Sequence, residues 1–176
     1  MSRIIAIVGA SGSGKTTLVN HIQKTLGIPA LVSYTTRPMR PGETDGVEHW
    51  FVTEDKMPDK DKMLAYTKFG EYHYWTEISQ LEDRTCMYVV DEKGLLELQA
   101  IQDKFFYERF DDFFDLVEVL IERDEKLIKE YVDEERMERD SGRTYLPHEC
   151  YQIVLKNNGT LEEFLQTATE IIKKIL

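Results

Sequence analysis

The sequence predicts an α/β fold of three layers, in which helices cover both faces of a mostly parallel sheet. Short apolar runs at 4–8, 87–90 and 116–121 are typical of strands buried on both faces. These runs alternate with helical segments, as they do in parallel sheets. The 176 residues also suit one domain, which should bury about 70% of its unfolded surface. We therefore expect a single α/β domain over residues 1–176.

The first half of that domain begins with a strand and a helix. The branched run at 4–8 predicts the strand, and residues 15–26 follow as a helix with Leu18, Ile22 and Leu26 on one face. Gly27 and Pro29 end the helix. Residues 30–32 are expected to form a second short strand.

From residue 33 to about 84 the pattern becomes polar, aromatic and alternating. Aromatic runs at 50–52 and 72–75 flank the charged stretch 54–62. This pattern predicts a β-rich insert, with the core formed by 1–32, 85–122 and 146–176. In the core we expect helices at 95–106 and 126–139, a strand at 151–155, and a final helix with a capping box of Thr160 and Glu163.

Composition and charge exclude several classes of protein. The chain has 22 Lys and Arg against 33 Asp and Glu, a net charge of −11. Such a surface repels nucleic acids and anionic membranes, so we expect neither as a partner. The apolar runs are shorter than the ~20 residues of a membrane span, and the chain is expected to be cytoplasmic. Cys86 is expected to be a buried thiol, and a bridge to Cys150 is left open.

A phosphate-binding loop is the strongest motif. Residues 9–16 are Gly-Ala-Ser-Gly-Ser-Gly-Lys-Thr, which match G-x-x-x-x-G-K-[ST] between a predicted strand and helix. Lys15 should reach the β- and γ-phosphates of ATP, and the Thr16 hydroxyl should bind Mg²⁺. The expected nucleotide-binding residues are Gly9, Ser11, Gly12, Ser13, Gly14, Lys15, Thr16 and Thr17.

Asp91 directly follows the predicted strand at 87–90. A carboxylate at such a strand end holds Mg²⁺ in related loops, often through water. An ordinary turn-capping aspartate before Gly94 is the alternative.

The segment 33–46 carries a second candidate site. Arg37 and Arg40 lie three residues apart among two prolines and a glycine, so they could bind a second phosphate in a bidentate manner. A solvated, proline-rich surface loop explains the same residues equally well.

The loop at 9–15, the block at 33–46 and the stretch 69–76 together resemble guanylate kinases. The resemblance implies a P-loop fold with an NMP-binding insert at 33–84 and a short helical lid at about 123–145. It implies that Arg37, Arg40 and Tyr74 hold the acceptor phosphate, and that Ser33 and Thr76 line its pocket. It also matches Asp91 to the second aspartate of the family's D-x-D strand end.

Three positions depart from the family pattern. Ala65 stands where a Glu contacts the guanine edge, Val89 replaces the first aspartate of D-x-D, and His49 replaces a phosphate-binding tyrosine. His49 can still donate to phosphate. Glu71 is a candidate substitute for the missing Glu.

Arginines near the predicted lid are the last candidates. The spacing of Arg136, Arg139 and Arg143 puts them within ~60° on a helix. Related kinases use lid arginines to neutralise the transferring phosphoryl group, so Arg136 and Arg139 are candidate catalytic residues with Lys15. A surface helix with i,i+4 ion pairs is the alternative. Asn157 and Asn158 suit either a donor adenine contact or a turn.

The resemblance implies a nucleoside monophosphate kinase that uses ATP and Mg²⁺, with GMP or dGMP as the expected acceptor. Two alternatives stay open: a kinase for another phosphorylated small molecule, such as a sugar phosphate, and a non-catalytic binding module. The expected partner is a small-molecule nucleotide, and the chain is expected to be a monomer or homodimer.

Overall fold

A computed structural model describes residues 2–109, 114–129, 132 and 140–176, with the side chains of 69 and 105–109 left out. The central sheet has the order β6-β1-β7-β8. All its pairings are parallel, which confirms the predicted α/β class. Its strands are β1 (Ser2–Val8), β6 (Thr85–Val89), β7 (Phe114–Glu122) and β8 (Ile153–Lys156).

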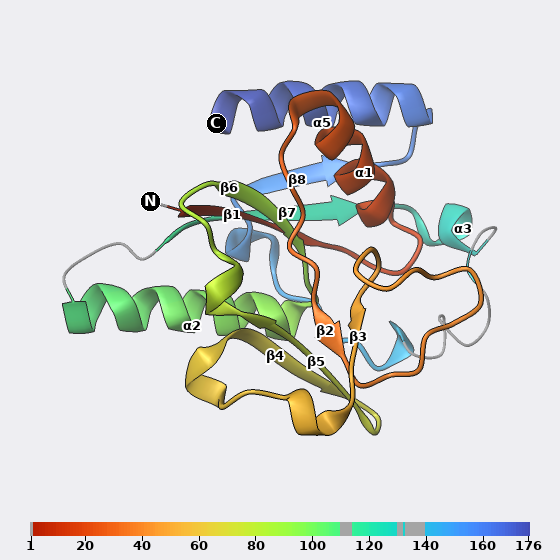
Figure 1. The fold of residues 1–176 in the computed structure, drawn as a ribbon. Helices are drawn as coiled ribbons and strands as arrows, with labels where there is room; N and C mark the ends of the chain where they lie inside the picture. Colours follow the sequence, from red (N-terminus) through yellow and green to blue (C-terminus); the bar gives the residue numbers. More distant parts are fainter. Residues whose placement is uncertain (1, 110–113, 130–131, 133–139) are drawn as a thin grey trace.

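Helices cover both faces of this sheet (Figure 1). On one face lies α2 (Glu92–Arg109), and on the other lie α1 (Lys15–Leu26) and α5 (Leu161–Ile175). The residues of β1 alternate between the two layers because successive side chains of a strand point to opposite faces. Ile4 and Ala6 pack in the α2 layer, and Ile5 and Ile7 pack in the layer of α1 and α5.

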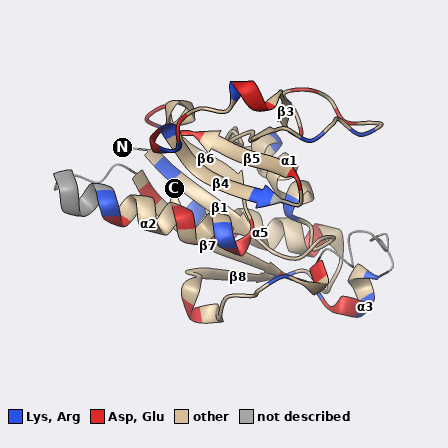
Figure 2. Ribbon diagram, turned by 90° about the horizontal axis from the view of Figure 1, so that it is seen from below, with Lys and Arg blue, Asp and Glu red and all other residues tan. Residues whose placement is uncertain are grey.

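Figure 2 shows the charge pattern that follows from this burial. Strand β6 carries no charged residue and β1 carries only Arg3, whereas α2 carries both signs along its length. The α5 helix begins with the predicted capping box, in which the Glu163 N–H donates to the Thr160 hydroxyl at 3.2 Å. In the described residues no helix has the length and apolar character needed to cross a bilayer.

A second, smaller sheet has the order β3-β2-β5-β4. Its strands all fall within the region 33–84 and are β2 (Tyr34–Thr35), β3 (Trp50–Phe51), β4 (Met63–Phe69) and β5 (Tyr72–Glu77). The β4–β5 pairing is antiparallel, and β4 packs against α2. Short 3₁₀ turns at Glu54–Lys56, Lys60–Lys62 and Ile78–Gln80 connect these strands to one another and to β6.

Some predicted elements differ from the observed ones. Residues 30–32 form no strand: Ala30 makes one isolated bridge to Met87, and the chain then leaves the sheet for the insert. The predicted helix at 126–139 is observed as α3 (Glu125–Ile128), and most of its remainder lies outside the described residues. A 3₁₀ turn at His148–Cys150 precedes β8. Cys86 is buried and both thiols are free, so the bridge between them is not formed.

Candidate functional site

The glycine-rich loop lies between the carboxyl end of β1 and the start of α1, as its sequence context predicts. Two of its glycines are required by geometry. Gly12 has φ +73°, and a Cβ there would lie 2.5 Å from Val132. Gly14 has φ +106°, and a Cβ would lie 2.6 Å from the side-chain amide of Asn157. L-residues are therefore excluded both by backbone conformation and by space.

Polar groups of the loop already hold an anionic side chain. The Ser11 N–H donates to Asp140 Oδ2 at 2.6 Å, and its hydroxyl donates to Oδ1 at 3.2 Å. The Lys15 ammonium folds back and donates to the carbonyls of Gly9 and Ala10 at 2.7 and 2.8 Å. An N–H of this loop thus binds a carboxylate oxygen in the way it would bind a phosphate oxygen.

Residues far along the chain donate hydrogen bonds to backbone carbonyls of the glycine-rich loop. The Asn157 amide donates to the Ser13 carbonyl at 2.8 Å, and Arg123 Nη1 donates to the Gly12 carbonyl at 3.1 Å. Asn158 exchanges hydrogen bonds with Asp124, donating to Oδ1 at 2.9 Å and accepting from its N–H at 2.8 Å. Asn157 therefore holds the loop in shape, a role that neither sequence interpretation of the Asn pair included.

The candidate metal ligands are Thr16 and Asp91. Thr16 and its neighbour Thr17 are exposed on the first turn of α1. Asp91 Oδ1 accepts from the Gly94 N–H at 2.8 Å, so this carboxylate caps α2, as the alternative interpretation expected. Among the described residues, no group of three or more His, Cys, Asp or Glu side chains has metal-binding geometry. One hydroxyl and one carboxylate suit Mg²⁺, which binds few protein ligands beside phosphates and water.

On the insert, Arg37 is held in one orientation by Glu43. Its side chain is only 8% exposed. Nη1 donates to Glu43 Oε2 at 2.9 Å and to the Pro38 carbonyl at 2.8 Å, and Nη2 donates to Glu43 Oε1 at 2.8 Å. These bonds lower the pKa of Glu43 to about 2 and raise that of Arg37.

The bonds to Glu43 and Pro38 do not use every N–H of the guanidinium. Arg37 has five N–H groups, and three of them make the bonds to Glu43 and Pro38. The other two, on Nε and Nη2, share an edge, which is the fork that binds two oxygens of a phosphate. Tyr74 approaches the same guanidinium and contributes to its raised pKa. The ring of Phe51 lies 5.3 Å below it.

Three further predicted residues lie around this guanidinium. His49 Nδ1 and Ser33 Oγ share a hydrogen bond of 2.8 Å, and the His49 and Tyr74 rings lie edge to face at 5.6 Å. Burial and the nearby Arg37 charge lower the pKa of His49. Arg40 is exposed, and its backbone N–H donates to Glu43 Oε2 at 2.7 Å. The structure therefore brings Ser33, Arg37, His49 and Tyr74 together.

The remaining positions were predicted to line the acceptor pocket or depart from the family pattern. Thr76 is fully buried and donates to the Tyr88 hydroxyl, so it belongs to the interior and not to the wall of the site. Ala65 is 4% exposed and packs in the apolar cluster that contains Tyr88 and Val90. Val89 is partly exposed. Glu71 lies exposed in the tight turn between β4 and β5, which argues against it as a replacement for the missing Glu.

The predicted lid is only partly described. Arg136 and Arg139 lie outside the described residues. Arg143 Nε donates to Glu92 Oε2 at 2.6 Å, and this pair is largely buried. The sequence analysis did not single out Glu92, because no local pattern links it to a residue 51 positions away.

Comparisons with known proteins agree with this arrangement. A family model described as guanylate kinase matches residues 1–175. A guanylate kinase of Protochlamydia amoebophila is 33% identical over 112 residues, which is 58% of this chain and 57% of that protein. A guanylate kinase of Thermobifida fusca is 40% identical over 78 residues, or 42% of this chain and 40% of that protein. The chain thus matches about half the length of these relatives, or less.

The fold is similar to a solved structure as well. The crystal structure of a guanylate kinase from Anaplasma phagocytophilum matches with a TM-score of 0.63 at 19% identity. The match covers 99% of this chain and 86% of that one.

Proposed function

The chain belongs to the guanylate kinase family, and on that basis we propose that it transfers the γ-phosphoryl group of ATP to the phosphate of a nucleoside monophosphate. GMP or dGMP is the expected acceptor. The observation that carries the proposal is the guanidinium of Arg37, which Glu43 holds in one orientation next to Tyr74. A second phosphate-binding group beside a P-loop is what a kinase with a phosphorylated acceptor needs.

In this reaction the bond between the bridging oxygen and the γ-phosphorus of ATP breaks, and an oxygen of the acceptor phosphate forms a new bond to that phosphorus. ADP leaves and a nucleoside diphosphate forms. The attacking oxygen is already ionised, so no general base is required. Catalysis then consists of alignment and of charge neutralisation by fixed groups.

Different residues of the chain bind the donor phosphates, bind the acceptor phosphate and neutralise the transferring group. N–H groups of residues 11–16 hold the donor phosphates, and Lys15 leaves the Gly9 and Ala10 carbonyls to reach the β- and γ-phosphates. Arg37 and Tyr74, with His49 and Arg40, hold the acceptor phosphate. Of the predicted lid residues, Arg136 and Arg139 remain the candidates for neutralising the transferring group.

We further propose that Thr16 and Asp91 take part in binding Mg²⁺, Thr16 directly and Asp91 through water. A bound Mg²⁺ would supply charge neutralisation at the β- and γ-phosphate oxygens. The free state of both cysteines supports a reducing compartment such as the cytoplasm. A monomer or homodimer is the expected assembly.

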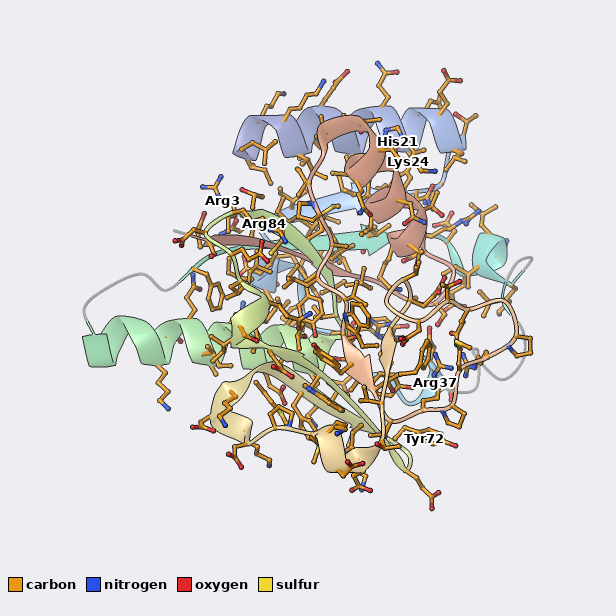
Figure 3. All side chains as sticks on the ribbon, in the orientation of Figure 1. Arg3, His21, Lys24, Arg37, Tyr72 and Arg84 are labelled. Atoms are coloured by element: carbon orange, nitrogen blue, oxygen red, sulfur yellow. The ribbon has the colours of Figure 1, made fainter. Side chains whose placement is uncertain are left out.

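The test is ADP formation from ATP with a panel of acceptors: GMP, dGMP, AMP, UMP, CMP, dTMP and a pentose phosphate. We expect turnover with GMP or dGMP, and its loss in Lys15→Met. The matched control is Lys24→Met, at the exposed far end of the same helix, which should keep full activity (Figure 3). If no acceptor supports ADP formation and ATP does not bind, the chain is a binding module and the proposal is wrong.

One observation favours a second candidate. Ala65 packs among apolar side chains, so the position that resembles a guanine-contacting site offers no polar group. A kinase for another phosphorylated small molecule, such as a sugar phosphate, would need the phosphate clamp without a base contact there. Preference for the pentose phosphate over every nucleotide would support that candidate.

A further inference from the structure

A buried ion pair at the start of α2 has no place in the function described so far. Glu92 directly follows Asp91 and opens α2, where it is only 5% exposed. Its Oε2 accepts from Arg143 Nε at 2.6 Å. The pair therefore joins the first turn of α2 to the C-terminal end of the predicted lid.

The pair is incomplete on both sides. A carboxylate and the Nε–Nη2 edge of a guanidinium can form two parallel hydrogen bonds, which would satisfy all four atoms. Here only one forms. Within the described residues, Glu92 Oε1 and Arg143 Nη2 are buried and have no hydrogen-bond partner. Leaving buried polar groups unpaired is costly, most of all when they are charged. This cost calls for a compensating ligand in some state of the protein.

The pair lies on the first turn of a helix that packs against the insert. The end of β6 touches the insert, because Thr76 of β5 donates to Tyr88. The helix that Glu92 opens also touches it, since Glu97 Oε2 accepts from the Tyr66 N–H at 2.6 Å. The insert carries Arg37, so α2 connects the lobe that holds the predicted phosphate-binding group to the segment of Arg143.

The segment that carries Arg143 also contacts the glycine-rich loop at residues 9–16. Asp140, three residues before Arg143, accepts from the Ser11 N–H. A phosphate that binds this N–H would compete with the Asp140 carboxylate for it, so binding of the donor is linked to the segment that carries Arg143.

We propose that Glu92 and Arg143 recognise the nucleoside part of the acceptor. Glu92 Oε1 accepts from an N–H or O–H of the substrate, and Arg143 Nη2 donates to a neighbouring oxygen or nitrogen. The ligand group thus carries a donor beside an acceptor, which describes both a nucleobase edge and a ribose hydroxyl. This inference rests on the proposed function and names the residues that set its acceptor specificity.

The test compares acceptor preferences at saturating ATP. In Glu92→Gln, which keeps shape and removes charge, we expect the KM of the preferred acceptor to rise at least tenfold, with kcat and the KM of ATP within about twofold. Arg143→Lys should act in the same direction. The matched control is Asp103→Asn, an exposed acid on the same helix, which should leave the acceptor KM unchanged. Thermal unfolding identifies any variant that fails to fold.

The acceptor panel distinguishes the two sources of the ligand group. If the base edge is recognised, Glu92→Gln reduces the kcat/KM ratio between GMP and the other bases. If a ribose hydroxyl is recognised, it reduces the ratio between GMP and dGMP. Equal ratios in wild type and both variants would overturn the inference and leave the pair a structural one. Absence of turnover in the wild type with every acceptor would instead overturn the proposed function, and the inference with it.

Discussion

Replacing Arg37 with Lys should weaken acceptor binding while leaving ATP binding intact. Three N–H groups of Arg37 bind Glu43 and Pro38, and the Nε–Nη2 edge is the part that can bind the phosphate beside Tyr74. A Lys ammonium has three donors in place of five and no planar fork, so it cannot keep the bonds to Glu43 and Pro38 and also bind two phosphate oxygens. Losing one charge-assisted bond costs about 1.5–3 kcal/mol, which is roughly a 10- to 100-fold fall in kcat/KM for the acceptor.

The assay is steady-state ADP formation with each substrate varied in turn. Arg84→Lys is the matched control, because Arg84 lies just before β6 at the far end of the sheet, where it pairs with Glu82 at 3.2 Å (Figure 3). The KM of ATP should stay within about twofold in both variants. An acceptor KM within twofold of wild type in a folded Arg37→Lys would refute the assignment of the Nε–Nη2 edge to the phosphate.

Three other predictions concern pH, thiol reactivity and donor affinity. The pKa of Glu43 is about 2 in the folded state against 4.5 as its ordinary value, so its pair with Arg37 contributes stability above about pH 4.5 and loses it as pH falls toward 2. The Tm difference between wild type and Glu43→Gln should shrink over that range, and a constant difference would contradict the pairing. Burial raises the pKa of Cys86 to about 11, so an alkylating reagent at pH 8 should modify Cys150 of the native protein before Cys86. Mass spectrometry measures the two rates, and equal rates would contradict the burial of Cys86. Asp140→Asn removes an anion from the P-loop and should tighten ATP binding several-fold by calorimetry; weaker binding would contradict the competition.

The glycine-rich loop at residues 9–16 could be predicted from sequence because the residues that define it are close together in the chain. The glycines, Lys15 and the helix start lie within eight residues, and the buried run at 4–8 placed them at a strand end. Cys86 and the capping box of Thr160 were predictable for the same reason, since burial and capping depend on nearby residues.

The acceptor side was predictable only in part. The short spacing of Arg37 and Arg40 singled out the segment, but the bidentate role of Glu43 followed from the fold of the loop. The contacts that link the two sides could not be predicted, since each joins distant positions. Asp140 bonds Ser11 across 129 residues, and the Glu92 pair spans 51. Tertiary packing alone brings such groups together.

The central claim is that one chain holds a donor and an acceptor phosphate site that face each other. Calorimetry with adenosine and guanosine joined through five phosphates tests it directly, because such a molecule fills both sites at once. The account predicts one-to-one binding at least 100-fold tighter than ATP alone, with most of the gain lost in Arg37→Lys and none lost in Arg84→Lys. Affinity no greater than that of ATP, or equal affinity in Arg37→Lys and wild type, would contradict it.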